Sequence, residues 1–570
     1  MSVKALLLYS HNVYSAIRLA FISFILLMSF RTQVIAQSWQ WVRGAKEASA
    51  YATTTDVSGN IYVTGSFGGA TTIFGTSTLN NLGLADVFLV KYDSLGNVLW
   101  ARSAGGAGND IATSAITDAS GNVYITGYFD SASTTITFGS ITLTNEASSA
   151  LSGNMFLVKY NAGGDVVWAK SAGGLGSDEA NSMATDAQGN IYIVGNFSSS
   201  FTLDTITLSA ASGNSDIFIA KYDSSGRIVW AKKTTESYIN NATSVCTDVA
   251  GNIYLAGYFN GSVIWGTDTV FGGGVGKTLL VKYDSSGNII WARSSNGSVF
   301  DCANSAITDA AGNVYIAGYF NGPGLTFDTS SIFATSATGM NGLLYLVKYD
   351  SSGNVKWATG PVSSTAFGIA SSIKNDALGD IYFSGAFTGP TIIFGTHTLV
   401  SEGPDPTIFL AKYNSLGNVV WAHSIVGNGA DYATSLNIDH KGNLYMTGYF
   451  IDGALTFDTT TLSCSSGDSA MYLVKLDSAN TTSTQFVHPN VIYALNTFPN
   501  PANGPFAIHV STSITEEAQI IITNVIGEKV KELTATTNTD IPVQLDTPPG
   551  IYFISAITTQ GTQTSKMVVW

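Results

Sequence analysis

The sequence is poor in charged residues, cysteine and histidine, and each shortage excludes a class of protein. Only 11% of its 570 residues are charged, the formal net charge is −14, and the lysines and arginines form no cluster. Because phosphate backbones are bound by clustered basic residues, we predict no nucleic-acid partner. Three scattered cysteines form no disulfide framework, and the six histidines show no metal-ligand spacing. The sequence therefore predicts no metal, no cofactor and no identifiable catalytic residue.

Long apolar runs and helical periodicity are also missing. The longest mostly apolar run, Leu19–Phe30, is too short to cross a bilayer core of about 30 Å. It follows Lys4 and Arg18 and precedes the small residues around Ala36, which is typical of a signal peptide. We predict a signal peptide at residues 1–36, with a retained membrane anchor as the alternative. No second apolar span follows, so we predict no transmembrane segment in the mature chain.

What the sequence does contain is a repeat. The pattern Asp-x-x-Gly-(Asn/Asp)-(Ile/Val/Leu)-Tyr occurs seven times at steps of 61 to 68 residues, which marks units that bury their faces against their neighbours. Each unit holds four runs of strand length, and a tryptophan in the fourth run is expected to pack between successive sheets. The aspartate of each pattern suits a turn. The repeat glycines are Gly59, Gly121, Gly189, Gly251, Gly312, Gly379 and Gly442.

Four-stranded sheets that repeat radially form a β-propeller. The last copy ends at Leu476 without a tryptophan strand, and Trp39–Arg43 at the other end of the chain matches the missing strand. We therefore predict an all-β, seven-bladed β-propeller at residues 38–478, closed by its N-terminal strand. Segments such as Asp118–Gly127 and Val158–Tyr160 resemble the SBBP family of bacterial β-propeller repeats. The resemblance implies this fold and no particular activity.

A different kind of sequence begins after Ser478. Residues 479–492 are a polar linker, and residues 493–570 contain strand-like runs that predict a small β-sandwich. This segment resembles the type A sorting domain of the type IX secretion system of Gram-negative Bacteroidetes. The resemblance implies that the type IX machinery exports the chain, which is then secreted or held on the outer-membrane surface; an accessory sandwich is the alternative. The matching residues include Pro499, Asn500, Pro501, Gly527, Gly550, Tyr552 and Lys566.

One set of polar residues is a candidate binding site. It lies eight residues before each turn aspartate, where the chain enters the innermost strand beside the central channel. We predict a polar ring at the channel mouth that holds a cation or sugar hydroxyls; the alternative is that these residues cap the connecting loops through backbone hydrogen bonds. Ala48 and Gly368 interrupt the set. Its polar members are Asp110, Asp178, Asn240, Asp301 and Asp431.

These features favour a secreted or cell-surface protein that binds or adheres to a glycan, peptide or protein ligand. The alternative is an extracellular polysaccharide lyase or hydrolase that uses paired aspartates of the ring. The sequence leaves enzymatic activity open, because a fold alone does not exclude it. Segments that vary between repeats, such as Ser131–Gly153, Phe201–Asp216 and Thr388–Thr407, are expected to carry recognition.

Overall fold

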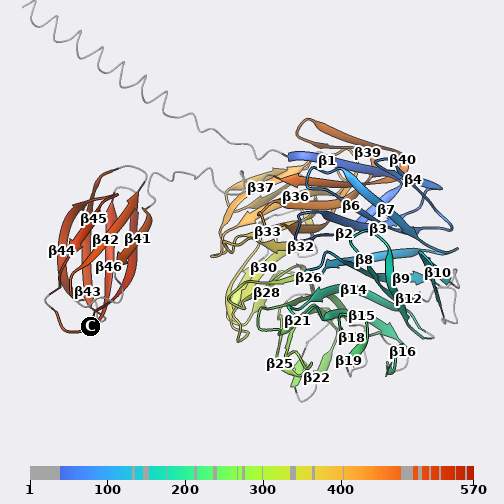
Figure 1. The fold of residues 1–570 in the computed structure, drawn as a ribbon, viewed down its shortest axis with the longest axis horizontal. Helices are drawn as coiled ribbons and strands as arrows, with labels where there is room; N and C mark the ends of the chain where they lie inside the picture. The colour runs from blue at the N-terminus through green and yellow to red at the C-terminus, as the bar shows by residue number, and fades with distance from the viewer. Residues whose placement is uncertain are drawn as a thin grey trace, which may run out of the picture. The chain divides into compact units, whose positions relative to one another are not determined.

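The computed structural model describes residues 39–476 and 492–569, apart from gaps at 131–134, 146–152, 175, 211–214, 235–239, 266–267, 272–275, 298, 334–341, 363–365, 402, 499–503, 513–514, 525–527, 546 and 559–560. Every element in these ranges is a β-strand, so the all-β prediction is confirmed (Figure 1). The chain divides into two compact units after Ser478. In the described ranges there is no helix long and apolar enough to cross a membrane. The predicted signal peptide at 1–36 and nearly all of the predicted linker at 479–492 lie outside the described residues.

The first unit contains seven four-stranded antiparallel sheets, which we number in chain order. Sheet 1 is β2 (Ala48–Thr55), β3 (Ile61–Phe67), β6 (Asp86–Tyr92) and β7 (Val98–Ala104). Sheet 2 is β8 (Asp110–Thr117), β9 (Val123–Asp130), β12 (Gly153–Tyr160) and β13 (Val166–Ala172). Sheet 3 is β14 (Asp178–Thr185), β15 (Ile191–Ser198), β18 (Ser215–Tyr222) and β19 (Ile228–Lys233).

The remaining four sheets repeat the same strand order. Sheet 4 is β20 (Asn241–Thr247), β21 (Ile253–Phe259), β24 (Lys277–Tyr283) and β25 (Ile289–Ser294). Sheet 5 is β26 (Phe300–Thr308), β27 (Val314–Asn321), β30 (Leu343–Tyr349) and β31 (Val355–Thr359). Sheet 6 is β32 (Phe367–Asn375), β33 (Ile381–Thr388), β36 (Thr407–Tyr413) and β37 (Val419–Ile425). Sheet 7 is β38 (Ala430–Ile438), β39 (Leu444–Phe457), β40 (Thr460–Leu476) and β1 (Trp39–Lys46).

A two-stranded hairpin follows the second strand of sheets 1 to 6, where the sequence analysis expects only a variable loop. In sheet 7 the long strands β39 and β40 continue to form the equivalent hairpin. The hairpins form because their inward positions are apolar; Ile136 and Phe138, for example, are fully buried. The hairpins are β4 (Thr71–Phe74) with β5 (Ser77–Asn80), β10 (Thr135–Phe138) with β11 (Ile141–Thr144), β16 (Ser200–Leu203) with β17 (Ile206–Ser209), β22 (Ser262–Trp265) with β23 (Asp268–Phe271), β28 (Gly324–Phe327) with β29 (Ser330–Phe333), and β34 (Thr391–Phe394) with β35 (His397–Val400).

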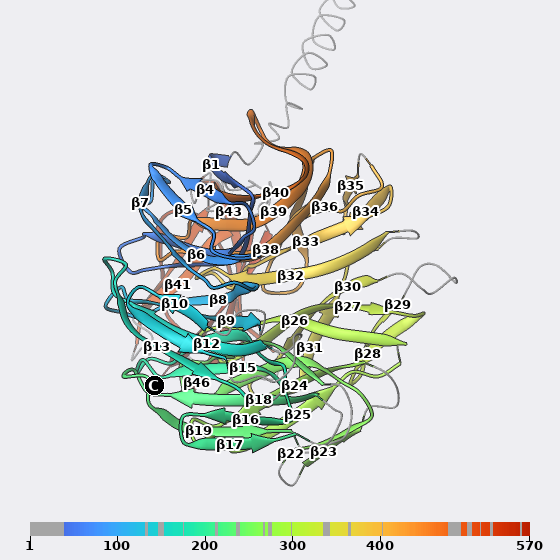
Figure 2. The same cartoon turned by 90° about the vertical axis from the view of Figure 1, so that its right-hand side faces the viewer.

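The arrangement of the seven sheets is propeller-like. Figure 2 shows them following one another in chain order, from blue through green to orange. The first strand of each sheet contacts the first strand of the next, and β38 of sheet 7 contacts β2 of sheet 1. We call these seven first strands, β2, β8, β14, β20, β26, β32 and β38, the inner strands.

Serine side chains connect the inner strands. In sheets 2 to 7 a serine four residues before the turn aspartate accepts a hydrogen bond from a backbone amide of the neighbouring inner strand. One of these bonds joins sheet 7 to sheet 1, from the amide of Thr53 to Ser435 Oγ at 3.2 Å. Thr434 Oγ1 also donates to the carbonyl of Ala50 at 2.9 Å. These bonds fix the spacing of the inner strands, because each one satisfies a backbone group that the inter-sheet contact would otherwise bury.

The N-terminal strand β1 pairs with β40, the strand that the sequence analysis expects it to contact. The antiparallel register runs from Trp39 opposite Leu476 to Lys46 opposite Ala470. Trp41 Nε1 donates to the carbonyl of Ser94 in sheet 1 at 3.3 Å. Trp100, Trp291 and Trp357 make the same bond to the following sheet, so the predicted packing of tryptophans between sheets is confirmed at these positions. Most of the rings are half-buried.

The repeat aspartates hold their turns, as the sequence predicts. Asp248 Oδ1 accepts bonds from the amides of Ala250 and Asn252, and its Oδ2 accepts bonds from Asn252 Nδ2 and the hydroxyl of Tyr254. Lys282 lies 3.9 Å from the same oxygen. The glycine of this turn has φ = 81°, which favours a residue without Cβ.

We expect Asp248→Ala to lower the free energy of unfolding by about 2 to 4 kcal/mol, because several buried donors lose their acceptor at once. The matched control is Asp284→Ala in the second turn of the same sheet, whose half-exposed side chain accepts bonds from the amides of Ser286 and Asn288. The control should cost about 1 kcal/mol or less, since water replaces these bonds. Denaturant titration of both variants measures the difference, and equal losses would contradict the assignment.

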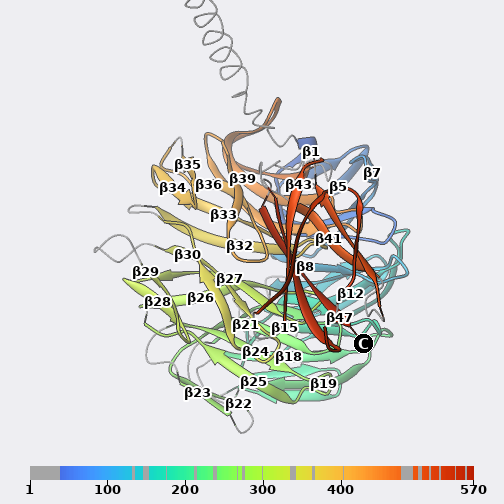
Figure 3. The same cartoon turned by 90° about the vertical axis from the view of Figure 1, so that its left-hand side faces the viewer.

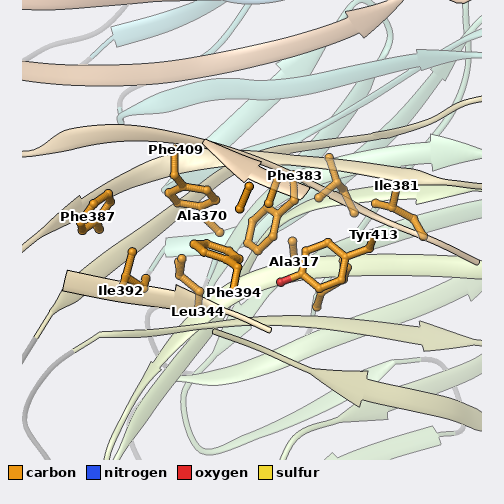
Figure 4. Packing of buried hydrophobic residues seen from close by; sticks show 14 of the residues in the cluster. Ala317, Leu344, Ala370, Ile381, Phe383, Phe387, Ile392, Phe394, Phe409 and Tyr413 are labelled. Carbon is orange, nitrogen blue, oxygen red and sulfur yellow. The ribbon is translucent and has the colours of Figure 1, made fainter. Parts of the chain in front are cut away.

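The core of the first unit lies between the sheets. Figure 4 shows one cluster, in which Phe383 and Phe409 of sheet 6 meet Leu344 of sheet 5 and Phe394 of the β34–β35 hairpin. The rings of Phe394 and Phe409 lie 5.0 Å apart. Each cluster of this kind combines residues of neighbouring sheets, so successive sheets stabilise one another.

The second unit, red in Figure 3, contains two sheets that share one apolar core. Alternate residues such as Ile520 and Ile522 are buried, which is the pattern of strands with one covered face. One sheet is β41 (Ile492–Phe498), β42 (Phe506–Thr512) and β45 (Asp540–Val543); the other is β44 (Lys529–Thr536), β43 (Glu517–Asn524), β46 (Gly550–Thr558) and β47 (Gly561–Val569).

Candidate functional site

The polar residues predicted to form a ring lie at or next to the first residue of five inner strands. All of them are buried: Asp110, Asp178 and Asp301 are 0% exposed, and Asn240 and Asp431 are 1% exposed. In the register of each sheet, Asp110, Asp178, Asp301 and Asp431 lie opposite a phenylalanine that is itself fully buried. Their side chains are therefore enclosed between neighbouring sheets.

Four of these residues donate a backbone hydrogen bond to the start of the third strand of the preceding sheet: Asp110, Asn240, Asp301 and Asp431. The amide of Asp110 donates to the carbonyl of Ala85 at 2.7 Å, and the amide of Asp301 donates to Gly276 at 2.9 Å. Asp301 Oδ2 lies 3.5 Å from Lys277 Nζ, and Oδ1 accepts a bond from the amide of Thr278 at 2.7 Å. Asp110 Oδ2 accepts a bond from the amide of Gly106 in the connecting loop at 2.6 Å. The bond from Gly106 caps a connecting loop, whereas Asp301 contacts residues of strand β24.

Burial raises the pKa of three of these carboxyl groups. Burial, together with the negative charges of Asp86 and Asp130, raises the pKa of Asp110 to about 7. It raises the pKa of Asp178 and of Asp431 to about 8. Asp178 and Asp431 therefore hold a proton at neutral pH and Asp110 is about half protonated, which lowers the cost of burying these carboxyl groups. In the described part of the chain no three His, Cys, Asp or Glu side chains gather as metal ligands.

A second set of residues is half-exposed and was missed by the sequence analysis. Tyr432 and Tyr449 of sheet 7 stack with their ring centroids 5.1 Å apart at 30°. Tyr51 of sheet 1 meets Tyr449 edge to face at 6.0 Å. Tyr128 lies on β9 of sheet 2, which contacts β14 of sheet 3, the strand that carries Glu179. Burial, and then the charges of Glu179, Tyr51 and Asp130, raise the pKa of Tyr128 to about 12. We call Tyr51, Tyr128, Tyr432, Tyr449 and Glu179 the tyrosine patch.

A second row of aromatic side chains lies on sheets 4 to 6. Tyr258 contacts Phe300 at 5.5 Å, Phe300 contacts Tyr319 at 6.0 Å, and Tyr319 contacts Phe367 at 6.2 Å between ring centroids. All four side chains are half-exposed and lie at the start of an inner strand or the end of the strand that pairs with it. Aromatic residues thus gather at one end of the inner strands on six of the seven sheets.

A sequence signal for this surface does exist. Tyr128, Tyr258, Tyr319 and Tyr449 each follow the glycine in the middle of a second strand and precede a buried phenylalanine. Because neighbouring residues of a strand point to opposite faces, the phenylalanine marks the covered face and the tyrosine the other one. The aligned repeats place Asn196 and Ser66 at this position in sheets 3 and 1.

The sorting residues fall in or near the strands of the second unit. Gly550 and Tyr552 lie in β46, where Tyr552 is buried and its hydroxyl donates to the carbonyl of Pro548 at 2.6 Å. Lys566 lies in β47 opposite Phe553. Pro499, Asn500, Pro501 and Gly527 lie outside the described residues.

The C-terminal unit matches a known family. The model of the secretion system C-terminal sorting domain matches residues 496–570, so the predicted sorting domain is confirmed. The chain is therefore an all-β, propeller-like protein with an address for type IX export, which implies secretion or attachment at the cell surface.

Two curated proteins and one solved structure show what the rest of the chain is similar to. An uncharacterized WD repeat-containing protein of Acanthamoeba polyphaga mimivirus is 26% identical over 453 residues, which are 67% of this chain and 32% of that protein. The regulatory protein FlaEY of Caulobacter vibrioides is 30% identical over 144 residues, which are 25% of this chain and 15% of that protein. The chain thus spans a third or less of these relatives. The apocarotenoid oxygenase of Synechocystis is 12% identical, with a TM-score of 0.35, over 75% of this chain and 95% of that one.

Proposed function

We propose that this protein is a binding or adhesion protein for a glycan, peptide or protein ligand, secreted or held on the outer-membrane surface of a Gram-negative bacterium. Residues 38–478 act as a closed seven-bladed β-propeller of SBBP-like repeats, the linker follows, and residues 493–570 form the β-sandwich that the type IX machinery reads. The observation that carries the proposal is the tyrosine patch. Half-exposed tyrosines on a rigid scaffold offer large amphipathic contact area that loses little entropy on binding.

The chemistry of the buried aspartates supports binding over catalysis. Asp110, Asp178 and Asp431 have the raised pKa that a general acid needs at neutral pH. However, all three are enclosed between sheets with at most 1% of their surface exposed. A lyase or hydrolase needs its acid within hydrogen-bond reach of the substrate, so these residues suit a structural role better.

The predicted polar ring is tested by substitution. We expect the combined change of Asp110, Asp178, Asp301 and Asp431 to asparagine to leave ligand affinity within about twofold, because asparagine keeps the shape of aspartate and each of the four residues is at most 1% exposed. Calorimetric titration with a ligand found by screening measures the affinity. A loss of tenfold or more, in a variant that still unfolds cooperatively, would show that the ring holds the ligand.

The ligand search itself tests the proposed function. The purified mature chain is screened on glycan and peptide arrays, and each captured compound is analysed for breakdown products after incubation. We expect reversible capture, recovery of the compound intact, and weaker capture by Tyr449→Leu. Release of shortened or unsaturated sugars would contradict a binding role and establish the enzyme alternative.

A further inference from the structure

The position of Glu179 suggests which ligand the tyrosine patch takes. Glu179 is the second residue of β14, and β14 contacts β9, the strand that carries Tyr128. The side chain is half-exposed. Among the described residues no lysine, arginine or histidine forms an ion pair with it, and the bond that it accepts from Ser177 Oγ is long, at 3.4 Å. A half-exposed carboxylate on a strand that contacts the strand of Tyr128 thus has no cation among the described ion pairs.

The four tyrosines add to this negative potential. The face of an aromatic ring is electron-rich and attracts ammonium and guanidinium groups within about 6 Å of its centre. Elsewhere in this protein, tyrosine rings bind lysines of the same chain: Lys91 lies 4.9 Å from the centre of the Tyr62 ring, and Lys159 lies 4.8 Å from that of Tyr124. Among the described cation–π pairs, none involves a tyrosine of the patch.

We propose that the tyrosine patch binds a cationic segment of a partner protein, with a lysine or arginine side chain held over the rings of Tyr128, Tyr449 and Tyr51 and paired with Glu179. The net charge of −14 draws such a segment toward the protein. A neutral sugar can donate hydrogen bonds to the carboxylate but leaves its charge unpaired, and an anionic polymer is repelled by it. This inference rests on the proposed binding function and names the class of partner.

The patch spans four neighbouring sheets and crosses the contact between sheet 7 and sheet 1. Tyr432 and Tyr449 belong to sheet 7, Tyr51 to sheet 1, Tyr128 to sheet 2 and Glu179 to sheet 3. Tyr51 is the extra residue of a bulge between Ala50 and Ala52, and a bulge redirects a side chain out of the regular alternation. At the same bulge position the other described sheets carry smaller residues, such as Thr113, Asn181 and Thr434. The bulge of sheet 1 alone places an aromatic ring there.

The test measures binding of the mature chain to an acetylated nine-residue peptide with three lysines between glycines and serines. The matched probes are the same peptide with acetyl-lysine, and maltohexaose as a neutral sugar. We expect binding of the lysine peptide alone, weakened at high salt. Glu179→Gln and Tyr449→Leu should each weaken it about 5- to 20-fold, whereas Tyr449→Phe, which keeps the ring, should stay within twofold. Asp165→Asn, an exposed carboxylate of a distant turn, is the control and should have no effect.

Three results would overturn the inference. Equal affinity of Glu179→Gln and wild type excludes the ion pair, and equal affinity of Tyr449→Leu and wild type excludes the rings. Capture of maltohexaose or of the acetylated peptide in place of the lysine peptide assigns the patch to a neutral ligand and leaves the proposed binding function standing. Failure of every probe here, together with failure of the array screen, would overturn both.

Discussion

Val42→Asp is expected to destabilise the first unit by about 4 kcal/mol or more, because it places an unpaired charge in an apolar cluster. Val42 is the central residue of β1 and is 8% exposed. It packs in the cluster that contains Leu436, Met446 and Val474 of sheet 7. Domains of this kind are stable by about 5 to 15 kcal/mol, so the loss is a large share of the total. Thermal or urea unfolding of the mature chain measures it.

The control for this prediction is on the same strand. Gln40 is two residues away and is exposed, so Gln40→Asp adds the same charge without burying it. Its free energy of unfolding should stay within about 0.5 kcal/mol of wild type. If Val42→Asp is tolerated as well as Gln40→Asp, β1 does not belong to the core of sheet 7.

The second large expected effect is that the free energy of unfolding depends on pH, because burial raises the pKa of aspartates such as Asp178. Asp178 has its pKa raised by burial to about 8 in the folded state, whereas the unfolded chain has the ordinary value near 4. The folded state therefore binds the proton more tightly, and the stability that this provides is complete below about pH 4 and is lost as the pH rises toward 8. Asp178→Asn removes this dependence.

The measurable quantity is the difference in the free energy of unfolding between wild type and Asp178→Asn. We expect it to change by about 1.4 kcal/mol for each pH unit between pH 5 and 7.5, so that the asparagine variant is clearly the more stable at pH 8.5. Asp223→Asn is the control, because hydrogen bonds, first that from Ser225, hold the pKa of this half-exposed turn residue at about 2. Its difference from wild type should therefore change only below about pH 4 and stay constant between about pH 5 and 8.5. A wild type that is equally stable relative to Asp178→Asn at pH 5 and pH 8.5 would contradict the burial of a protonated carboxyl group.

Much of the fold could be predicted because the sequence repeats. The turn aspartates, the glycines with positive φ and the tryptophans recur at fixed spacing, and a residue that recurs in every unit does the same structural work in each. The similarity between the strands of Trp41 and Trp100 could be recognised in the sequence for the same reason. The hairpins were missed, because their alternation of residues such as Ile136 and Phe138 spans only four positions and the intervening loops differ between units.

The candidate site was less predictable, and the reason is geometric. The aspartates at the strand starts share a position in the repeat, but a sequence does not say whether a strand residue faces its neighbouring sheet or the open end. A fully buried phenylalanine opposite each carboxyl group settles this for Asp110, Asp178, Asp301 and Asp431. The tyrosine patch depends on departures from the repeat, such as Tyr51 and Glu179, and a search for shared residues overlooks them.

The account depends most on the contact between sheet 7 and sheet 1, because Tyr449 and Tyr51 meet there and β1 completes sheet 7. Hydrogen exchange of the mature chain, read at the backbone amides of β1, tests this contact directly. We expect the amides that point toward β40, such as those of Arg43 and Ala45, to exchange as slowly as those of β39, through global unfolding alone. Exchange of the β1 amides within seconds, while β39 stays protected, would show that the strand is not held there and that the ring of sheets is open.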